Sequence, residues 1–184
     1  MTEEIIIAGF GGQGVLSMGK ILSYSGIMQG QEVSWMPSYG PEMRGGTANV
    51  TVIVSDERVS SPILNEYDTA IILNQQSMDK FESMIKPGGY LLYDPNGITR
   101  HPERKDINVY KITGAKLAAE MGNTKVFNMV VLGAYLKMRP ILEYDNVVAG
   151  LTKSLPERYH KLIPLNEEAI KKGLENLEAI NVVK

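Results

Sequence analysis

A glycine-rich turn that follows a short apolar run is the feature that most constrains the fold. The run from Ile5 to Ala8 is continuously apolar and rich in β-branched residues, which is typical of a strand buried in a parallel sheet. Four glycines follow in "GFGGQG", and the next stretch, "VLSMGKIL", has apolar residues at helical spacing. The sequence therefore predicts a strand, a tight turn and a helix, the opening unit of an α/β sheet.

The rest of the chain continues this alternation of strands and helices. Further strands are expected at residues 33–36, 47–54, 67–74, 90–94 and 107–112. Helices are expected at residues 76–85, 114–121, 124–138, 143–154 and 166–179. We therefore predict an α/β fold: an open, doubly wound, Rossmann-like sheet covered on both faces, with a helical C-terminal third that packs over one side. Residues 1–184 contain no repeat and no long linker, so we expect a single domain.

Charge and composition exclude several classes of function. The 184 residues include 19 basic and 21 acidic side chains, a formal net charge of -2, and no run of five like charges, so we expect neither nucleic acid nor a membrane as partner. An acidic N-terminus and the lack of an apolar segment of about 20 residues predict a cytoplasmic protein. The chain has no cysteine to ligate an iron–sulfur cluster, and His101 and His160 are too far apart for a local metal motif, so we expect no metal site.

The spacing of the glycines matches a phosphate-binding fingerprint. Gly9, Gly11 and Gly14 satisfy G-x-G-x-x-G between a strand and a helix, where backbone N–H groups can receive a phosphate. The acidic residue that would bind a ribose is missing, because Glu32 begins the second predicted strand instead of ending it. The turn fits a phosphate or diphosphate of another ligand, or only a close strand-to-helix crossing. A methyltransferase, suggested by "KPGGYLL", rests on analogy of fold alone.

A stiff, polar loop, "PSYGPEMRGG", follows the second predicted strand. Pro37 and Pro41 each fix one φ angle and bias the preceding residue toward extended geometry, so the loop should hold its shape without a ligand. Glu42 and Arg44 point the same way if that piece is extended, and they can pair with each other or reach one partner. Such a loop at the carboxyl end of a strand is where open α/β sheets bind ligands or neighbouring proteins.

The two motifs together resemble a known family. "GFGGQGV" with "PSYGPEMRGG" about 25 residues later is similar to the gamma subunit, or gamma domain, of the 2-oxoacid:ferredoxin (acceptor) oxidoreductases. The similarity extends through "TANVTVIVSD" and "NTKVFNMVVLGAYL", and "PSYGPEMRGGTAN" most resembles the 2-oxoglutarate type.

The resemblance implies a subunit of a larger enzyme. In that family a 2-oxoacid is oxidatively decarboxylated with coenzyme A to acyl-CoA and CO2, and ferredoxin or another low-potential acceptor is reduced. Thiamine diphosphate lies between the alpha and beta subunits, and iron–sulfur clusters lie in beta or delta. We therefore expect this chain to bind none of these cofactors alone, to be inactive in isolation, and to have alpha, beta and, in some assemblies, delta subunits as partners.

The site residues that the resemblance suggests belong to the two motifs, and none of them is expected to be catalytic. We expect them to face the alpha subunit and the path of coenzyme A; they are Gly9, Gly11, Gly12, Gln13, Gly14, Tyr39, Glu42, Arg44, Gly45 and Gly46. Arg44 is either a clamp for a phosphate or carboxylate or an interface anchor, and we favour the anchor.

Each of three further side chains allows two interpretations, and two alternative functions also stay open. For Trp35 and Tyr39 we favour core or interface packing over ligand contact. For Asn128 we favour a satisfied buried polar residue over a hydrogen bond to the glycine turn. The alternative functions are a free-standing NAD(P)-dependent oxidoreductase and a binding module for an adenylate or a coenzyme A thioester.

Overall fold

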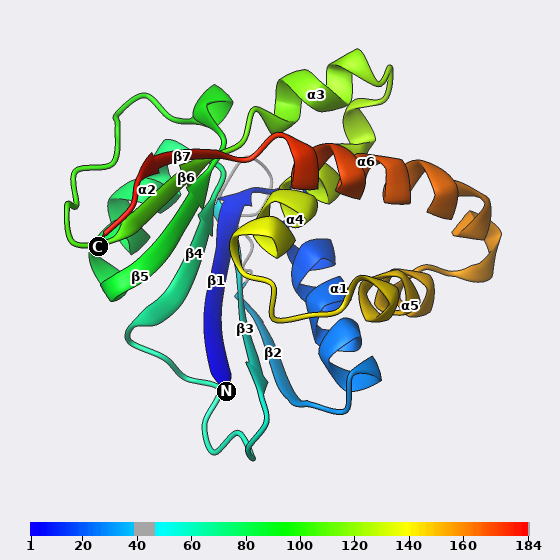
Figure 1. Cartoon of the computed structure of the whole chain (residues 1–184), viewed down its shortest axis with the longest axis horizontal. Coiled ribbons are helices and arrows are strands. Elements are labelled where there is room, and N and C mark those ends of the chain that lie inside the picture. The colour runs from blue at the N-terminus through cyan, green and yellow to red at the C-terminus, as the bar shows by residue number, and fades with distance from the viewer. Residues whose placement is uncertain (39–46, 184) are drawn as a thin grey trace.

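A seven-stranded mixed sheet forms the centre of the molecule. The computed structural model describes residues 1–38 and 47–183. In this part of the chain the strands stand in the order β2-β3-β1-β4-β5-β6-β7, with helices on both faces (Figure 1). The strands are β1 (Thr2–Phe10), β2 (Glu32–Ser38), β3 (Thr47–Ser55), β4 (Tyr67–Ile72), β5 (Ile85–Tyr93), β6 (Asn108–Lys111) and β7 (Glu178–Asn181). The helices are α1 (Val15–Met28), α2 (Gln75–Phe81), α3 (Gly114–Glu120), α4 (Phe127–Met138), α5 (Tyr144–Ser154) and α6 (Ile163–Glu175).

Five of the strands run in one direction. β1, β4, β5 and β6 are parallel neighbours, whereas β3 is antiparallel to both β1 and β2, and β7 is antiparallel to β6. β2 therefore shares the direction of β1 without touching it, because β3 lies between them. The α/β class and the opening strand, turn and helix are as the sequence predicts.

Alternate residues of the central strand feed two hydrophobic cores. Ile5 and Ile7 face the side that α1, α4, α5 and α6 cover. Ile6 and Ala8 face the opposite side, where α2 supplies Met78 to the core. Because both faces are buried, β1 is apolar along its middle instead of alternating. The prediction of a sheet covered on both faces, with the C-terminal helices on one side, is confirmed (Figure 1).

The most apolar helix, α4, is buried between the sheet and α6. Gly133 and Gly173 let the two helices approach so closely that a Cβ at Gly173 would lie 2.7 Å from the backbone nitrogen of Ala134. Among the described residues, no helix combines the length and apolar character that crossing a membrane requires. The apolar length of α4 reflects burial in a protein core.

A buried ion pair anchors the end of α4 to the sheet. The Glu3 carboxylate is fully buried on β1 and accepts hydrogen bonds from the Nε of Arg139, at 3.0 Å, and from the hydroxyl of Thr69, at 2.6 Å. The Arg139 guanidinium also lies 4.4 Å from the ring centroid of Tyr90. Pairing and hydrogen bonding offset the cost of burying this carboxylate.

Some predicted element boundaries are wrong. The helix expected at residues 76–85 is shorter and the strand expected at 90–94 is longer: α2 ends at Phe81, a 3₁₀ turn (Glu82–Met84) follows, and β5 already begins at Ile85. β5 accommodates its glycines through an irregular pairing with β4 between Tyr67 and Thr69. The predicted helix at 166–179 is α6, which ends at Glu175, and the chain then adds β7 to the edge of β6.

Candidate functional site

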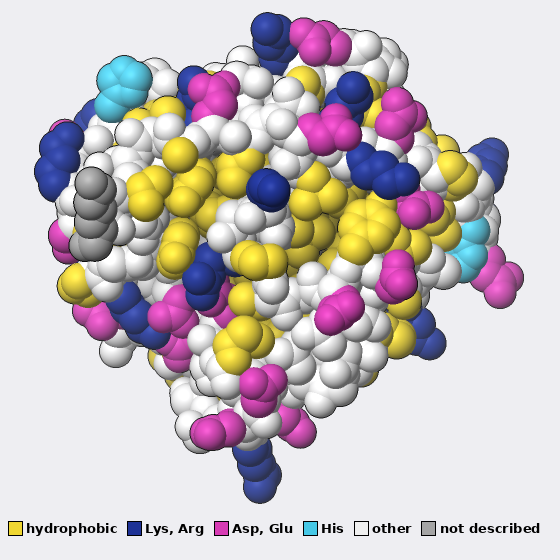
Figure 2. Space-filling view, viewed as in Figure 1, with side chains coloured by type: hydrophobic (Ala, Val, Ile, Leu, Met, Phe, Trp, Pro, Cys, Tyr) yellow, Lys and Arg dark blue, Asp and Glu magenta, His cyan; other side chains and the backbone are white. Residues whose placement is uncertain are grey.

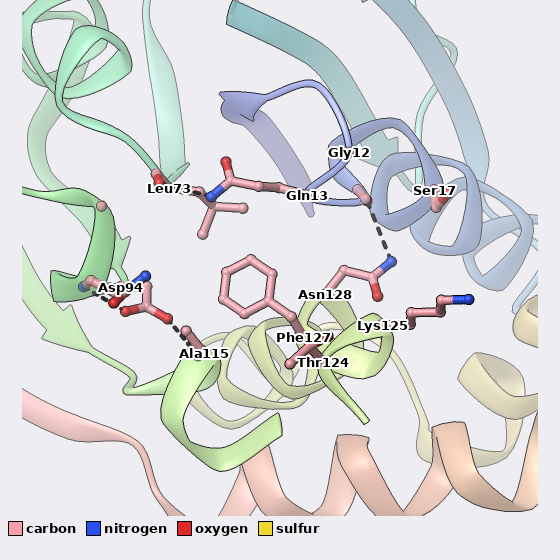
Figure 3. Close-up of a pocket in the computed structure, with 13 residues that line it drawn as sticks. Gly12, Gln13, Ser17, Leu73, Asp94, Ala115, Thr124, Lys125, Phe127 and Asn128 are labelled. Atoms are coloured by element: carbon pink, nitrogen blue, oxygen red, sulfur yellow. Dashed lines mark hydrogen bonds between the residues drawn. The ribbon is translucent and has the colours of Figure 1, made fainter. Parts of the chain in front are cut away.

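The carboxyl ends of the parallel strands meet around a pocket of about 420 Å³ (Figure 3). The turn after β1 forms one wall, the residues after β4 and β5 form a second, and the starts of α3 and α4 form the third. Open α/β sheets bind ligands at this edge. We take this pocket, called the first pocket from here on, as the candidate site.

The glycine turn has the backbone geometry that requires glycine. Gly12 and Gly14 have φ angles of 92° and 76°, in the left-handed region that side chains disfavour. A Cβ on Gly14 would also lie 2.6 Å from the Cγ of Asn128, and one on Gly9 would lie 2.9 Å from the Cβ of Leu73. The turn is therefore tight on its inner side, whereas Gly11 and Gly12 are exposed to solvent.

Gln13 ties the turn to the neighbouring strand. Its Oε1 accepts a hydrogen bond from the backbone N–H of Phe10 at 2.6 Å, and its Nε2 donates to the carbonyl of Leu73 at 3.2 Å. Figure 3 shows the side chain reaching from the turn toward the end of β4. Both polar ends of the amide are thus used to hold the turn's shape, which is a positioning role.

Asn128 contacts the turn from the start of α4. It is half-buried, and its Nδ2 donates to the carbonyl of Gly14 at 3.5 Å, drawn as a dashed line in Figure 3. The favoured interpretation, a satisfied buried polar residue instead of a hydrogen bond to the glycine turn, is therefore wrong. The side chain lines the pocket and borders its ligand-accessible space.

Asp94 is a pocket residue that was not predicted from the sequence. It directly follows β5, is only 2% exposed, and accepts hydrogen bonds from the backbone N–H groups of Asn96 at 2.8 Å and Ala115 at 2.9 Å. Burial raises the pKa of the Asp94 carboxyl, and these N–H groups oppose the rise without cancelling it. The detectable signal was an aspartate directly after a buried strand, in "YLLYD".

Lys125 and Ser17 also belong to the polar lining of the pocket, and no local sequence pattern indicates either of them. Ser17 is on the first turns of α1, and Lys125 is in the 3₁₀ turn (Thr124–Val126) before α4. Both are exposed. Only the packing of α4 beside α1 brings them to one wall, so they are neighbours in space and not in sequence.

The structure brings only part of the predicted site together. Gly12, Gln13 and Gly14 line the first pocket, Gly9 lies buried at the end of β1, and Gly11 borders a shallower hollow beside Phe10 and Ala48. The loop residues predicted for the site lie outside the described residues; they are Tyr39, Glu42, Arg44, Gly45 and Gly46. The residues that flank this loop are described, and Thr47, just after it, pairs with Phe10 beside the glycine turn.

The position of Glu32 weighs against a dinucleotide site. Glu32 pairs with Ser55 at the far end of β3, whereas the glycine turn adjoins the opposite end of that strand at Thr47. β3 also separates β2 from β1, so the strand that would present a ribose-binding acid is not the neighbour of the turn. Among the described residues, no three metal-ligating side chains gather in one place.

Trp35 lies on the edge strand β2 and is 41% exposed. Its indole nitrogen would lie 3.2 Å from a Cβ on Gly19 of α1, so part of the ring rests against that helix. Core packing is therefore wrong for Trp35, and interface packing stays a prediction.

The fold and the pocket define an α/β domain with a glycine turn at the carboxyl edge of its sheet. Residues 4–176 match the family of pyruvate ferredoxin/flavodoxin oxidoreductases. The chain belongs to this family, and the resemblance inferred from the two motifs is confirmed.

Relatives of the chain include parts of longer proteins and subunits of similar length. It is 38% identical over 135 residues to ketoisovalerate oxidoreductase subunit VorA of Methanothermobacter marburgensis, covering 73% of this chain and 28% of that protein. It is 34% identical over 161 residues to 2-oxoglutarate synthase subunit KorC of Methanocaldococcus jannaschii, covering 85% and 86%. The chain thus spans little more than a quarter of VorA but most of KorC.

The similar solved structures likewise include a separate subunit of similar length and a part of a longer chain. A keto/oxoacid ferredoxin oxidoreductase gamma subunit from Geobacter sulfurreducens superposes with a TM-score of 0.83 at 28% identity, covering 96% of both chains. The 2-oxoglutarate:ferredoxin oxidoreductase from Magnetococcus marinus, with 2-oxoglutarate, coenzyme A and succinyl-CoA bound, gives a TM-score of 0.85 at 26% identity. That alignment covers 95% of this chain and 30% of the Magnetococcus chain.

Proposed function

We propose that this chain is the gamma subunit of a 2-oxoacid:ferredoxin (acceptor) oxidoreductase with 2-oxoglutarate as the substrate. The assembled enzyme decarboxylates the 2-oxoacid oxidatively, forms the acyl-CoA, releases CO2 and passes the electrons to ferredoxin or a similar acceptor. The observation that carries the proposal is the near end-to-end agreement with relatives that are themselves subunits, KorC and the Geobacter gamma subunit. The Magnetococcus relative supports coenzyme A as the co-substrate.

In this proposal the chain supplies surface, and its partners supply the redox chemistry. Thiamine diphosphate and the iron–sulfur clusters belong to the alpha, beta and delta subunits, and this chain has no cysteine to ligate a cluster. Both carboxylate oxygens of Asp94, the acid in the first pocket, are already held by backbone N–H groups. These bonds fix the orientation of the carboxyl group, which suits a residue that shapes a binding pocket.

The surface in question is the edge of the sheet around the glycine turn. Gly11, Gly12 and Gly14 leave backbone groups accessible to a phosphate of coenzyme A, and Lys125 adds a cation to the first pocket from the start of α4. We assign Tyr39, Glu42, Arg44, Gly45 and Gly46 to this surface as well. The pairing of Thr47 with Phe10 supports that assignment, because the described chain resumes beside the turn.

Exposed apolar side chains support a partner protein. They lie in separate places: Trp35, on the edge strand β2, is 41% exposed, and Ile180 and Val182, at the β7 edge, are 52% and 53% exposed. Figure 2 shows a further band of hydrophobic side chains across the face that α4, α5 and α6 form. Large exposed apolar patches mark interaction surfaces in soluble proteins. A gamma subunit that docks on alpha and beta subunits would cover part of this surface.

The proposal is tested by measuring 2-oxoacid-dependent reduction of a viologen dye in the presence of coenzyme A. We expect no turnover by the purified chain and turnover after co-purification with its alpha and beta subunits. 2-Oxoglutarate should be used in preference to 2-oxoisovalerate and pyruvate. Turnover by the isolated chain, or a complex that prefers another 2-oxoacid, would contradict the respective part of the proposal.

The role of Arg44 is tested in the same complex with Arg44→Ala, and Arg58→Ala is the control because Arg58 is exposed. We expect Arg44→Ala to weaken assembly, which identifies an interface anchor. A complex that stays intact with a raised KM for coenzyme A would instead identify a clamp on the ligand.

A further inference from the structure

The outer side of the edge strand β7 is open to a further strand. Among the described strands β7 is the last of the sheet and has β6 as its one neighbour, and Figure 1 shows it at the border beside the C terminus. Edge strands present backbone N–H and C=O groups that can pair with another chain. Just past β7, the N–H of Val182 donates to no group in the described part of the chain. The edge can therefore donate at least one more hydrogen bond.

Side-chain hydrogen bonds hold this edge in place. The Nδ2 of Asn181 donates to the carbonyl of Ile107 at 2.8 Å, and the Oδ1 of Asn108 accepts from the backbone N–H of Val183 at 3.0 Å. These bonds attach the chain to the start of β6 beyond the last residue of β7. A partner that pairs with this edge would therefore meet a preformed surface, which lowers the entropic cost of binding.

The two edges of the sheet differ in their protection against pairing. The opposite edge, β2, contains Glu32 and Pro37, and a charge and a missing N–H both discourage the addition of a strand. Residues 179–183, "AINVV", contain neither a charge nor a proline. Their larger apolar side chains are exposed: Ile180 by 52%, Val182 by 53% and Val183 by 39%. An apolar edge without such protection indicates a surface that a partner covers.

A hollow of about 280 Å³, called the edge hollow from here on, opens beside Ile180. Its apolar lining comes from Ile180, Tyr93, Pro95 and Ile98. The pairing of β6 with β7 is irregular at Ile180, which has no partner residue on β6. A side chain of a strand added beside β7 could enter this hollow next to Ile180. Pairing through the backbone with a pocket for a side chain is a recurring way of recognising an extended peptide.

The ionisable side chains that line the edge hollow are basic. They are Arg100, His101 and Lys111, and none of the described acids lines it. Arg100 pairs with Glu82 at 3.0 Å and Lys111 pairs with Glu178 at 2.8 Å. His101 is exposed and has no salt bridge to any described residue. The charge that is still available at this end of the edge is therefore that of His101.

The other end of the edge also carries an available cation. Asn181 of β7 donates from its Nδ2 to the carbonyl of Lys105 at 3.5 Å, so Lys105 lies beside this end. Lys105 is exposed, and no described acid forms a salt bridge with it. Basic groups at both ends of an apolar edge complement an apolar segment with acidic residues on either side.

We propose that the β7 edge binds an extended segment of a partner subunit, which adds a strand to the sheet beside β7. The segment places an apolar side chain in the edge hollow and carries acidic residues that meet Lys105 and His101. This inference rests on the proposed function, because the occupant is a subunit of the assembled enzyme. It adds to that function the surface that is used and the chemistry of the segment that binds there.

Hydrogen exchange of backbone amides tests the added strand. The chain is compared alone and in the complex with its co-purified alpha and beta subunits. The amide of Val182 should exchange more slowly in the complex, because it gains an acceptor from the added strand. Unchanged exchange at residues 178–183 would overturn the inference.

Variants of the edge test the same surface through the dissociation constant between the chain and the alpha–beta unit. Ile180→Ser and Val182→Pro should each weaken association about tenfold, since one loses apolar contact and the other loses the N–H. Ile63→Ser is the matched control, because Ile63 is 72% exposed in the loop between β3 and β4 and should leave association unchanged. Equal affinities of all three variants would contradict the proposal. Urea unfolding checks that each variant is folded.

A charge variant tests the acidic character of the segment. Lys105→Gln should weaken association about threefold and reduce its dependence on salt, because one exposed charge pair is lost. Lys116→Gln should have no such effect, because Lys116 lies on α3 and pairs with Glu120 at 3.8 Å. If both variants bind like the wild type, the segment is not acidic and that part of the proposal is wrong.

A second copy of the chain is the competing occupant, and sedimentation of the isolated chain distinguishes it. We expect a monomer, both for the wild type and for Ile180→Ser. A wild-type dimer that Ile180→Ser dissociates would overturn the inference, because the edge would then pair with itself.

Failure of this inference differs from failure of the proposed function. A complex that contains Ile180→Ser and Val182→Pro, assembles like the wild type and turns over 2-oxoglutarate would refute the edge site alone. Edge variants that weaken association as described, in a complex that never turns over a 2-oxoacid, would refute the proposed function alone.

Discussion

At the scale of single residues, position 14 requires glycine for two reasons, its backbone conformation and the lack of space for a Cβ, and their costs can be measured separately. Its φ of 76° is costly for any side chain, and a Cβ would also collide with Asn128. Gly30 has a similar φ, 81°, but nothing lies within 4 Å of its would-be Cβ. The two glycines therefore form a matched pair that separates backbone strain from crowding.

We predict that Gly30→Ala lowers the free energy of unfolding by about 1 kcal/mol, the cost of the left-handed conformation. Gly14→Ala should cost about 2 kcal/mol more, because Asn128 must also move. Adding Asn128→Ala should recover most of that difference. Urea unfolding of the three variants measures these values, and equal costs for Gly14→Ala and Gly30→Ala would show that Asn128 does not crowd the turn.

The buried carboxyl of Asp94 predicts a pH dependence. Because its pKa is raised on folding, the folded state holds its proton to higher pH than the unfolded state. Stability therefore falls as pH rises from the usual aspartate pKa, about 3.9, through the raised value. Asp94→Asn removes this contribution.

We predict that Asp94→Asn gains stability relative to the wild type as pH rises through that window and holds the gain at neutral pH. The measurement is the difference in unfolding free energy between the two proteins across pH, since every other titrating group is common to both. The account of Asp94 is wrong if the difference runs the opposite way or stays flat.

At the scale of elements, the crossing of α4 and α6 fixes where the C-terminal helices stand. Gly173 is buried against the backbone of α4, and no side-chain rearrangement can relieve a clash with backbone atoms.

We predict that Gly173→Ala lowers the free energy of unfolding by about 3 kcal/mol, the upper range for overpacking a core. Lys172→Ala, one residue away on the exposed side of α6, should change it by less than about 0.5 kcal/mol. Thermal or urea unfolding checks both, and a tolerated Gly173→Ala would mean that the helices can separate without cost.

The elements that the sequence predicted best are the ones whose residue pattern is set by burial. β1 and α4 are apolar because both are enclosed, so period and composition reveal them. β7 escaped prediction because "EAIN" is short and exposed, and its strand conformation depends on pairing with β6. The segment "KPGG" was misread because glycine and proline usually end an element, whereas here it forms an irregularity within β5, between the pairs of Ile85 with Tyr67 and of Tyr90 with Thr69.

At the scale of the whole molecule, the glycine turn was predictable and the rest of the pocket was not. The turn is a local motif whose geometry follows from glycine spacing. Asp94, Lys125 and Ser17 come from segments far apart in the sequence, and only the sheet order and the packing of α4 on α1 bring them together. The insertion of β3 between β1 and β2 likewise follows from a long-range pairing that no local pattern encodes.

The whole molecule corresponds to one part of a larger enzyme, and in some relatives the matching domain is part of a longer chain. The Magnetococcus chain contains a domain like this one in 30% of its length, whereas the Geobacter gamma subunit matches it end to end. A domain that is found both fused and separate needs a surface for the remainder of the enzyme.

The most direct test adds the purified chain in increasing amounts to alpha and beta subunits that were purified without it. Coenzyme A-dependent reduction of viologen by 2-oxoglutarate is measured at each step. We predict that activity rises in proportion to the added chain and saturates when each alpha–beta unit has bound one copy. Full activity of the alpha and beta subunits before the chain is added, or none after it saturates, would contradict its role as the gamma subunit.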